Sequence, residues 1–147
     1  MARYVTRINS PKSPDEAFAY MADLRNFAQW DPGVKKAVLA EGDTPGLGAA
    51  FDVTVKGPGR DLTLRYRITE FNAPHELLAV AKSSVFTSID RITVIPTPSG
   101  CTVTYNAELR LNGLLAVADP GLRIAFHRIG DRATRGLRTA LGPSGVD

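Results

Sequence analysis

The final long stretch of the chain constrains its fold most, because it predicts one long helix that is apolar along a single side. In DPGLRIAFHRIGDRATRGLRTALG, residues 119–142, apolar side chains recur at steps of three and four. Asp119 before Pro120 is a typical helix start, and Gly142 before Pro143 is a typical helix end. With a rise of about 1.5 Å per residue, such a helix crosses a small domain. The rest of the chain must therefore cover its apolar side.

The two sides of this expected helix differ in chemistry. The apolar stripe consists of Leu122, Phe126, Ile129, Ala133, Leu137, Ala140 and Leu141, and the polar side carries Arg123, Arg128, Asp131, Arg132, Arg135 and Arg138. Gly130 and Gly136 lie on or beside the stripe, where each costs about 1 kcal/mol relative to alanine. Close packing of a neighbour would explain them, but we interpret them as making room for a pocket.

The middle of the chain predicts strands, because apolar and polar residues alternate there with period two. The expected strands, including one at the start of the chain, are Ala2–Asn9, Val34–Glu41, Ala50–Lys56, Asp61–Phe71, Leu77–Lys82, Phe86–Ile95 and Cys101–Leu111. Short turns rich in Gly, Pro and Asp join successive strands, which favours an antiparallel meander with one wet and one dry face. Two short helices, from Pro14 to Leu24 and from Asn26 to Trp30, follow the first strand. A sheet of six to seven strands curls strongly, and only the terminal helix can cover its dry side.

Composition narrows the class of protein. With 147 residues, 44% of them hydrophobic and 22% charged, the chain fits a single domain, 1–147, with a core from about residue 3 to 141. Cys101 is the only cysteine, which excludes an internal disulfide and a cysteine-rich metal site. The sequence shows no signal peptide and no run of eighteen apolar residues, so we expect a cytoplasmic protein without a membrane span.

Three stretches carry a resemblance to a known superfamily. AFAYMADLRNFAQWDPGV (17–34), YRITEFNAPHELL (66–78) and SGCTVTYNAELRL (99–111) resemble segments of the helix-grip superfamily, which includes START domains, polyketide cyclases and plant pollen allergens. The likeness spans roughly residues 3 to 141 and fits the bacterial polyketide cyclase/dehydrase-like branch best. It implies an α+β helix-grip fold, in which a curved antiparallel sheet wraps around the C-terminal helix. It also implies a cavity between sheet and helix for an apolar or aromatic ligand.

Asp90 is the candidate for chemistry in such a cavity. If Phe86, Ser88, Asp90, Ile92 and Val94 point inward, a carboxyl group lies among apolar neighbours; the opposite phase buries Arg91 instead. Burial raises the pKa of a carboxyl group and suits it to acid–base catalysis near neutral pH. The alternative is an Asp paired with an arginine or a tyrosine hydroxyl, or one at the cavity mouth. Tyr66 and Tyr105 lie on the dry faces of their strands, where they can bind a ligand oxygen or simply fill the core.

The remaining candidates are side chains expected to line the cavity. The full set of expected ligand-binding residues is Phe27, Trp30, Phe51, Val53, Leu64, Tyr66, Phe86, Ser88, Ile92, Tyr105, Leu122, Phe126, Ile129 and Ala133. Phe27 and Trp30 either form a gate at the cavity mouth or anchor the short helices to the sheet. His75 and His127, with one cysteine, do not form a metal-ligand pattern, so neither a metal nor another cofactor is expected.

These features favour a protein that binds or carries a lipid-like or polyketide-like hydrophobic small molecule. The alternative is a polyketide cyclase or dehydratase in which Asp90, Tyr66 and Tyr105 position the substrate and move a proton. A third hypothesis is an interaction module that acts through the arginine side of the last helix. That side, with the net charge of +3, is more typical of a solvated surface, and no nucleic-acid partner is expected. The sequence leaves open whether the chain forms a homodimer.

Overall fold

The computed structural model describes residues 2–56, 59–84, 86–111 and 119–142, with the backbone alone described for 119–126. The elements, in chain order, are β1 (Ala2–Ser10), α1 (Pro14–Ala22), the 3-10 helix η1 (Leu24–Asn26), α2 (Phe27–Trp30), β2 (Val34–Glu41), β3 (Ala50–Val55), β4 (Leu62–Asn72), β5 (Glu76–Lys82), β6 (Phe86–Thr97), β7 (Gly100–Leu111) and α3 (Asp119–Leu141). The predicted order of strand, short helices, meander and long helix is confirmed.

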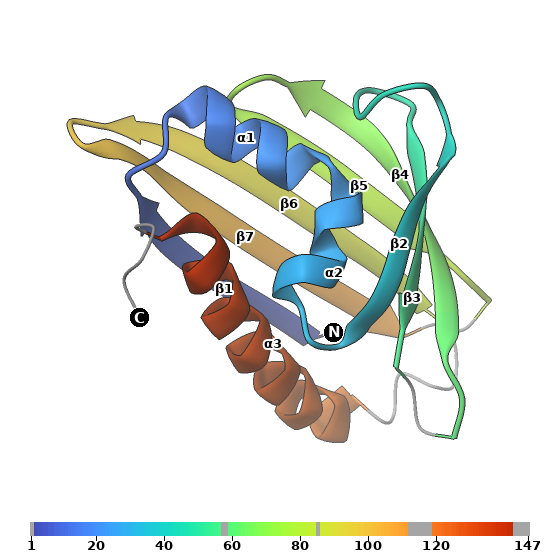
Figure 1. The fold of residues 1–147 in the computed structure, drawn as a ribbon. Coiled ribbons are helices and arrows are strands. Elements are labelled where there is room, and N and C mark those ends of the chain that lie inside the picture. Colours follow the sequence, from blue (N-terminus) through green and yellow to red (C-terminus); the bar gives the residue numbers. More distant parts are fainter. Residues whose placement is uncertain (1, 57–58, 85, 112–118, 143–147) are drawn as a thin grey trace.

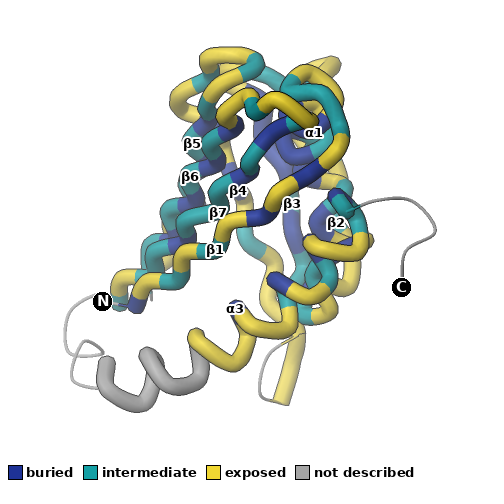
Figure 2. The backbone as a smooth tube through the Cα atoms, turned by 90° about the vertical axis from the view of Figure 1, so that its left-hand side faces the viewer, coloured by how far each residue is buried: buried dark blue, intermediate teal, exposed yellow. Residues whose placement is uncertain are grey.

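The seven strands form one antiparallel sheet in the order β1-β7-β6-β5-β4-β3-β2. Strands β2 to β7 therefore follow one another as a meander, and β1 joins the far edge beside β7 with Ile8 opposite Val103. Figure 1 shows the strongly curved sheet, with α1 and α2 on its inner side and α3 along β1. This is the predicted helix-grip arrangement. Buried and exposed residues alternate along β1, as Figure 2 shows, because successive side chains point to opposite faces.

The short helices are placed by local signals in the sequence. Ser13 caps α1, since its hydroxyl accepts a hydrogen bond of 3.2 Å from the backbone N–H of Glu16, and Pro14 occupies the first turn. Phe18 and Met21 are buried from the same helix, which packs on β6 and β7. Asp23 ends α1 and caps η1 by accepting a hydrogen bond from the N–H of Arg25. Helices α1 and η1 thus cover one end of the concave face.

Helix α3 is attached chiefly to β1 and to α2. The hydroxyl of Tyr4 donates a 2.8 Å hydrogen bond to Asp131 and lies 2.9 Å from the hydroxyl of Thr134. At the other end, Ser10 donates to the backbone carbonyl of Leu141. The buried residues of the described part of α3 are Gly130, Thr134, Leu137 and Leu141.

The apolar stripe predicted for α3 is therefore partly wrong. Ile129 is 48% exposed, because the helix turns Gly130 and Thr134 toward β1 in its place. Ala133 and Ala140 are half-buried, and Leu137 is fully buried as predicted. The side chains of Leu122 and Phe126 lie outside the described part of the structure.

The two glycines of α3 do not leave room for a ligand as predicted. A Cβ at Gly130 would lie 2.4 Å from the ring of Tyr4, and a Cβ at Gly136 would lie 1.7 Å from the backbone carbonyl oxygen of Trp30. Both glycines allow neighbouring protein atoms to approach the helix closely. Close packing against Tyr4 and Trp30 accounts for both glycines, so they are not an argument for a ligand pocket.

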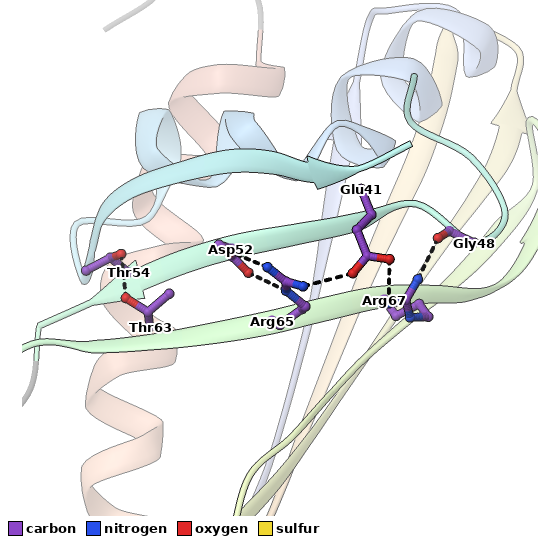
Figure 3. A network of polar contacts seen from close by, with 7 residues as sticks. All are labelled: Glu41, Gly48, Asp52, Thr54, Thr63, Arg65 and Arg67. Carbon is purple, nitrogen blue, oxygen red and sulfur yellow. Dashed lines mark hydrogen bonds and ion pairs between the residues drawn. The ribbon is translucent and has the colours of Figure 1, made fainter. Parts of the chain in front are cut away.

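The convex face of the sheet is the polar one, in agreement with the predicted meander that has one wet and one dry face. Arg65 bonds to Asp52 and Glu41, and Arg67 bonds to Glu41 and to the backbone carbonyl of Gly48, as Figure 3 shows. These side chains are largely exposed, so each ion pair contributes about 0–1 kcal/mol to stability. They define the solvated side of the sheet. None of the helices in the described ranges combines the length and the apolar character needed to cross a membrane.

Candidate functional site

Four polar side chains form a hydrogen-bonded chain on the concave face. The Tyr66 hydroxyl lies 2.8 Å from the Ser88 hydroxyl, which donates a 3.2 Å bond to one carboxyl oxygen of Asp90. The Tyr105 hydroxyl donates to the other oxygen. Asp90 is only 2% exposed. Strands β4, β6 and β7 therefore bring together the three residues predicted to be catalytic.

The phase of β6 decides which residues reach this face. Ser88, Asp90, Ile92 and Val94 are buried, as predicted from the larger apolar set. Arg91 points to the opposite side, where it forms ion pairs with Glu76 and Glu70. The alternative phase, with Arg91 inside, is excluded. Pairing of Asp90 with a tyrosine hydroxyl, one of the alternatives foreseen for this residue, is what the structure contains.

Burial controls the protonation of the cluster. It raises the pKa of Asp90 from 3.8 to about 6, although hydrogen bonds from Tyr105 and Ser88 act in the opposite direction. Burial also raises the pKa of Asp31, whose carboxylate accepts a 2.8 Å hydrogen bond from the N–H of Gly33. The pKa values of Tyr66 and Tyr105 lie well above 10.0, first because of burial and then because of the charge of Asp90. The tyrosines thus stay neutral near pH 7, while Asp90 changes protonation near pH 6.

Aromatic rings surround the polar cluster. Trp30 meets Phe27 and Tyr105 edge-to-face, with ring centroids 5.0 and 5.5 Å apart, and Phe27 also meets Tyr66 at 6.4 Å. Trp30 and Phe27 are 2% and 3% exposed. Such pairs add about 0.5–1.5 kcal/mol beyond simple burial. This arrangement fits the interpretation that the two residues anchor α2 to the sheet.

A small cavity of about 60 Å³ lies next to this cluster, between α3, β1, β7 and the end of α2. Among the described residues, those that line it are Tyr4, Thr6, Trp30, Asp31, Tyr105, Ala107, Ile129, Gly130, Ala133, Thr134 and Leu137. The volume corresponds to about two water molecules in the liquid. Tyr105 borders the cavity, whereas Asp90 and Tyr66 are not part of its lining. The indole N–H of Trp30 is buried and has no hydrogen-bond partner among the described residues.

The concave face is packed unevenly along its length. At the end covered by α1 and η1, Phe51, Ile68 and Leu77 are 0–1% exposed. At the opposite end, the apolar side chains that share this face are only half-buried: Leu64, Phe86, Leu109 and Leu111. The sheet therefore has a packed end and an incompletely covered end, and the small cavity lies between them along β7.

The predicted lining residues fall into separate groups. Trp30, Tyr105, Ile129 and Ala133 line the cavity. Phe51, Val53 and Ile92 belong instead to the fully buried core. Leu64 and Phe86 lie at the incompletely covered end, and Phe27 is buried beneath Trp30.

Seven of the residues that line the cavity are absent from the expected ligand-binding set: Tyr4, Thr6, Asp31, Ala107, Gly130, Thr134 and Leu137. Asp31 directly follows Trp30 at the end of the second expected helix, and an acidic residue next to the only tryptophan is a signal in the sequence that could have marked it. Tyr4 lies within the first expected strand, Ala2–Asn9. Its role depends on the position of α3, which the strand pattern does not contain. Within the described ranges no three His, Cys, Asp or Glu side chains group as metal ligands.

A wider and more open groove of about 710 Å³ lies on the convex face, lined by residues that include Thr69, Val80, Thr87 and Ile89. It faces away from Asp90 and from the aromatic cluster, because neighbouring residues in a strand point to opposite faces. The cavity beside Tyr105 is less open and borders a residue bonded to Asp90, so it is the better candidate site despite its smaller volume.

Comparison with known proteins agrees with this architecture. The family model for polyketide cyclase / dehydrase and lipid transport matches residues 1–142. A START superfamily protein from Mycobacterium smegmatis superposes with a TM-score of 0.74 at 11% identity, covering 95% of each chain. Ginseng major latex-like protein 151 from Panax ginseng gives a TM-score of 0.71 at 13% identity, covering 97% of this chain and 98% of its own.

A third similar structure is the di-domain ARO/CYC StfQ from the steffimycin biosynthetic pathway. Its TM-score is 0.68 at 14% identity, and the match covers 95% of this chain and 50% of StfQ. At such identities the structural likeness establishes the fold alone. No curated protein matches the sequence. The family model, which covers nearly the whole sequence, shows that the chain belongs to the polyketide cyclase/dehydrase and lipid transport family.

Proposed function

We propose that the protein binds a hydrophobic small molecule on the concave face between the sheet and α3, as a carrier or binding protein. The observation that carries the proposal is the unequal coverage of this face. Phe51 and Ile68 are fully buried by the short helices, whereas Phe86 and Leu109 remain half-buried at the other end. An apolar ligand would cover these side chains and gain about 25 cal/mol for each Å² removed from water.

The size of the cavity limits how such a ligand binds. Sites for small organic ligands usually measure about 300–1,000 Å³. The cavity beside Tyr105 measures about 60 Å³, so it accommodates only one end of the ligand. Ala107 lines this cavity and lies on the same face of β7 as Leu109 and Leu111. The body of the ligand would therefore extend along β7 toward the incompletely covered end.

The first experiment is native mass spectrometry of the purified chain, followed by titration with Nile red, an uncharged apolar fluorophore. We expect a co-purified apolar molecule or saturable one-to-one binding of the dye. Ala133→Leu places a larger side chain into the cavity lining and should weaken binding about ten-fold or more. Ala140→Leu is the matched control, because Ala140 is half-buried on the same helix outside that lining. Equal affinity in both variants would contradict the proposal.

A second candidate function is polyketide cyclisation or dehydration, and the raised pKa of Asp90, about 6, favours it. Tyr105 connects Asp90 to the cavity. In an aldol closure, a methylene proton of the substrate would pass to the Tyr105 oxygen while the phenolic proton moves to the Asp90 carboxylate. The new carbanion would attack a second carbonyl of the same chain, and the resulting alkoxide would take back one proton by the same route. Elimination of water would complete a dehydration.

Asp90→Asn separates the two candidates. The amide can still accept a hydrogen bond from Tyr105, but it cannot take up a proton. A carrier should keep its affinity for Nile red in this variant. A cyclase should keep that affinity and lose ring closure of a linear poly-β-ketone thioester, followed by mass spectrometry and NMR of the product. Absence of ring closure by the unchanged chain would remove the second candidate.

A further inference from the structure

We infer that the outer side of α3 is a docking surface for an anionic lipid membrane. The surface consists of Arg128, Arg132 and Arg135 with Ile129 beside them, and we call it the arginine face. All four residues are exposed. The inference goes beyond the proposed function, because it concerns where the protein docks and not which ligand it holds.

The first support is the alignment of the three arginines along the helix. They are separated by four and then three positions, so they share one side and extend over about 10 Å. Thr134 and Leu137 are buried on the opposite side, where α3 contacts β1 and α2. The row therefore faces away from the sheet, and Figure 2 shows exposed residues along this stretch of α3.

The second support is that the protein leaves these charges unpaired. The three arginines form no ion pair with any residue in the described ranges. On the convex face of the sheet, by contrast, Arg65, Arg67 and Arg91 are all paired with acids. Positive charge without an internal partner therefore gathers on α3, and anionic head groups would supply the counter-charge.

The groove beside the arginine face has the same character. It lies between α2 and α3 and brings Lys56 to the same opening as Arg132. Asp31 shares this groove, but its carboxylate accepts a hydrogen bond from the N–H of Gly33. Asp131 of α3 is likewise engaged, by the hydroxyl of Tyr4. The acids beside the row thus have partners of their own, whereas its cations do not.

The third support is an apolar side chain within this charged surface. Ile129 is 48% exposed next to Arg128, and an aliphatic side chain can enter the boundary between head groups and acyl chains. Proteins that bind single-stranded nucleic acid instead combine cations with aromatic rings that stack on bases. The exposed large apolar side chains of the described residues include no aromatic ring. This combination favours a lipid surface over a nucleic acid.

Docking on this face would also bring the small cavity close to the membrane. Ile129 and Ala133, which follow two of the arginines in the chain, both line the cavity beside Tyr105. A hydrophobic ligand that leaves the bilayer would then reach the cavity over a short path. This consequence rests on the proposed function, whereas the docking itself does not.

Flotation of the full chain with lipid vesicles tests the inference. We expect binding to vesicles of phosphatidylcholine with phosphatidylserine, loss of binding at high salt, and no binding to phosphatidylcholine alone. A variant that combines Arg128→Gln, Arg132→Gln and Arg135→Gln should bind roughly a hundred-fold more weakly, since each arginine near an anionic surface contributes about five-fold.

The matched control is a variant that combines Arg7→Gln, Lys36→Gln and Lys82→Gln. It removes the same charge from exposed positions outside α3. Because charges beyond about 10 Å are largely screened at ordinary ionic strength, this control should weaken binding by less than about five-fold.

A second pair of variants tests the apolar contact. Ile129→Ser should weaken binding to the anionic vesicles about five-fold at constant salt, because it removes the side chain that enters the membrane. Ile95→Ser is the matched control, since Ile95 is 55% exposed on β6 and lies outside α3. This pair locates the docking surface even if the triple arginine variant does not fold.

The possible outcomes separate this inference from the proposed function. Equal binding to neutral and anionic vesicles, or anionic binding that the triple arginine variant retains, would overturn the inference. Binding to a single-stranded DNA oligonucleotide without binding to vesicles would also overturn it. If the chain bound Nile red but no vesicle, the proposed function would stand alone. If it bound anionic vesicles but no Nile red, the docking surface would stand and the proposed function would fall.

Discussion

Gly136 of α3 lies against the backbone carbonyl of Trp30 at the end of α2, so closely that a Cβ on Gly136 would stand 1.7 Å from that oxygen. This contact joins the terminal helix to the short helix that carries the aromatic cluster. It fixes how near Leu137, one residue further along α3, comes to the cavity beside Trp30. A glycine that looks unfavourable in a helix is therefore a requirement of the fold.

Gly136→Ala should destabilise the protein, although alanine is the better helix former by about 1 kcal/mol. The added methyl group must push α3 away from α2, and overpacking of this kind typically costs about 1–3 kcal/mol. Urea unfolding followed by circular dichroism would measure the change. Arg135→Ala, at the exposed neighbouring position, should leave the free energy of unfolding within about 0.5 kcal/mol. A more stable Gly136→Ala variant would show that the close contact is not present.

Tyr4→Phe should loosen α3 on the sheet. The change removes the hydroxyl that bonds to Asp131 and Thr134, at a cost of about 1 kcal/mol for the lost hydrogen bonds. The substitution should increase the rate of amide hydrogen exchange more across residues 130–138 than across β6. Tyr20→Phe provides the control, because its bond to Gln29 is exposed and lies outside the α3–β1 contact. If the exchange rates in α3 were unchanged in Tyr4→Phe, packing alone would hold α3 on the sheet and the Tyr4 hydroxyl would not contribute.

Asp90 should make the protein less stable as the pH rises from about 4 to 6. Its pKa is about 6 in the folded chain and near 3.8 in an unfolded one, so the folded state binds more protons in that interval. The free energy of unfolding therefore falls with pH, by roughly 3 kcal/mol for a shift of this size. The raised pKa of Asp31 acts in the same direction.

Asp90→Asn should remove most of that pH dependence, as measured by urea unfolding on either side of the interval. Asp52→Asn is the control, because the hydrogen bond from Arg65 lowers the pKa of Asp52 and its contribution has the opposite sign. This control should leave the decrease in stability with rising pH in place. A decrease that persists unchanged in Asp90→Asn would show that Asp90 titrates at its ordinary pKa.

Most of the fold could be predicted from the sequence because its signals are local. Alternation from Val34 to Leu111 defined the strands and their inner face, and Ser13 with Pro14 marked the start of α1. The rotation of α3 was harder to predict. It depends on which residues allow β1 and α2 to approach, and hydrophobicity alone favoured Ile129 over Gly130 and Thr134.

The candidate site was predicted less completely, because it combines side chains from distant segments. The phase of β6 was enough to place Asp90 inside, and the alternation of β7 placed Tyr105 on the same face. Asp90 and Tyr105 are diagonal neighbours on β6 and β7, so the hydrogen bond between them depends on the register of these two paired strands. The position of Asp31 in the cavity lining depends on how the end of α2 packs against α3. Neither relationship is contained in a periodic pattern.

The central claim is that an apolar ligand occupies the concave side of the sheet next to Trp30 and Tyr105. The most direct measurement is a map of amide and methyl chemical-shift changes on saturation with octanol. We expect the changes to centre on Ala107, Leu109 and Ala133, with the indole signal of Trp30 among them. Changes centred on Val80 and Thr87 would place the ligand in the groove on the convex face and would contradict the account.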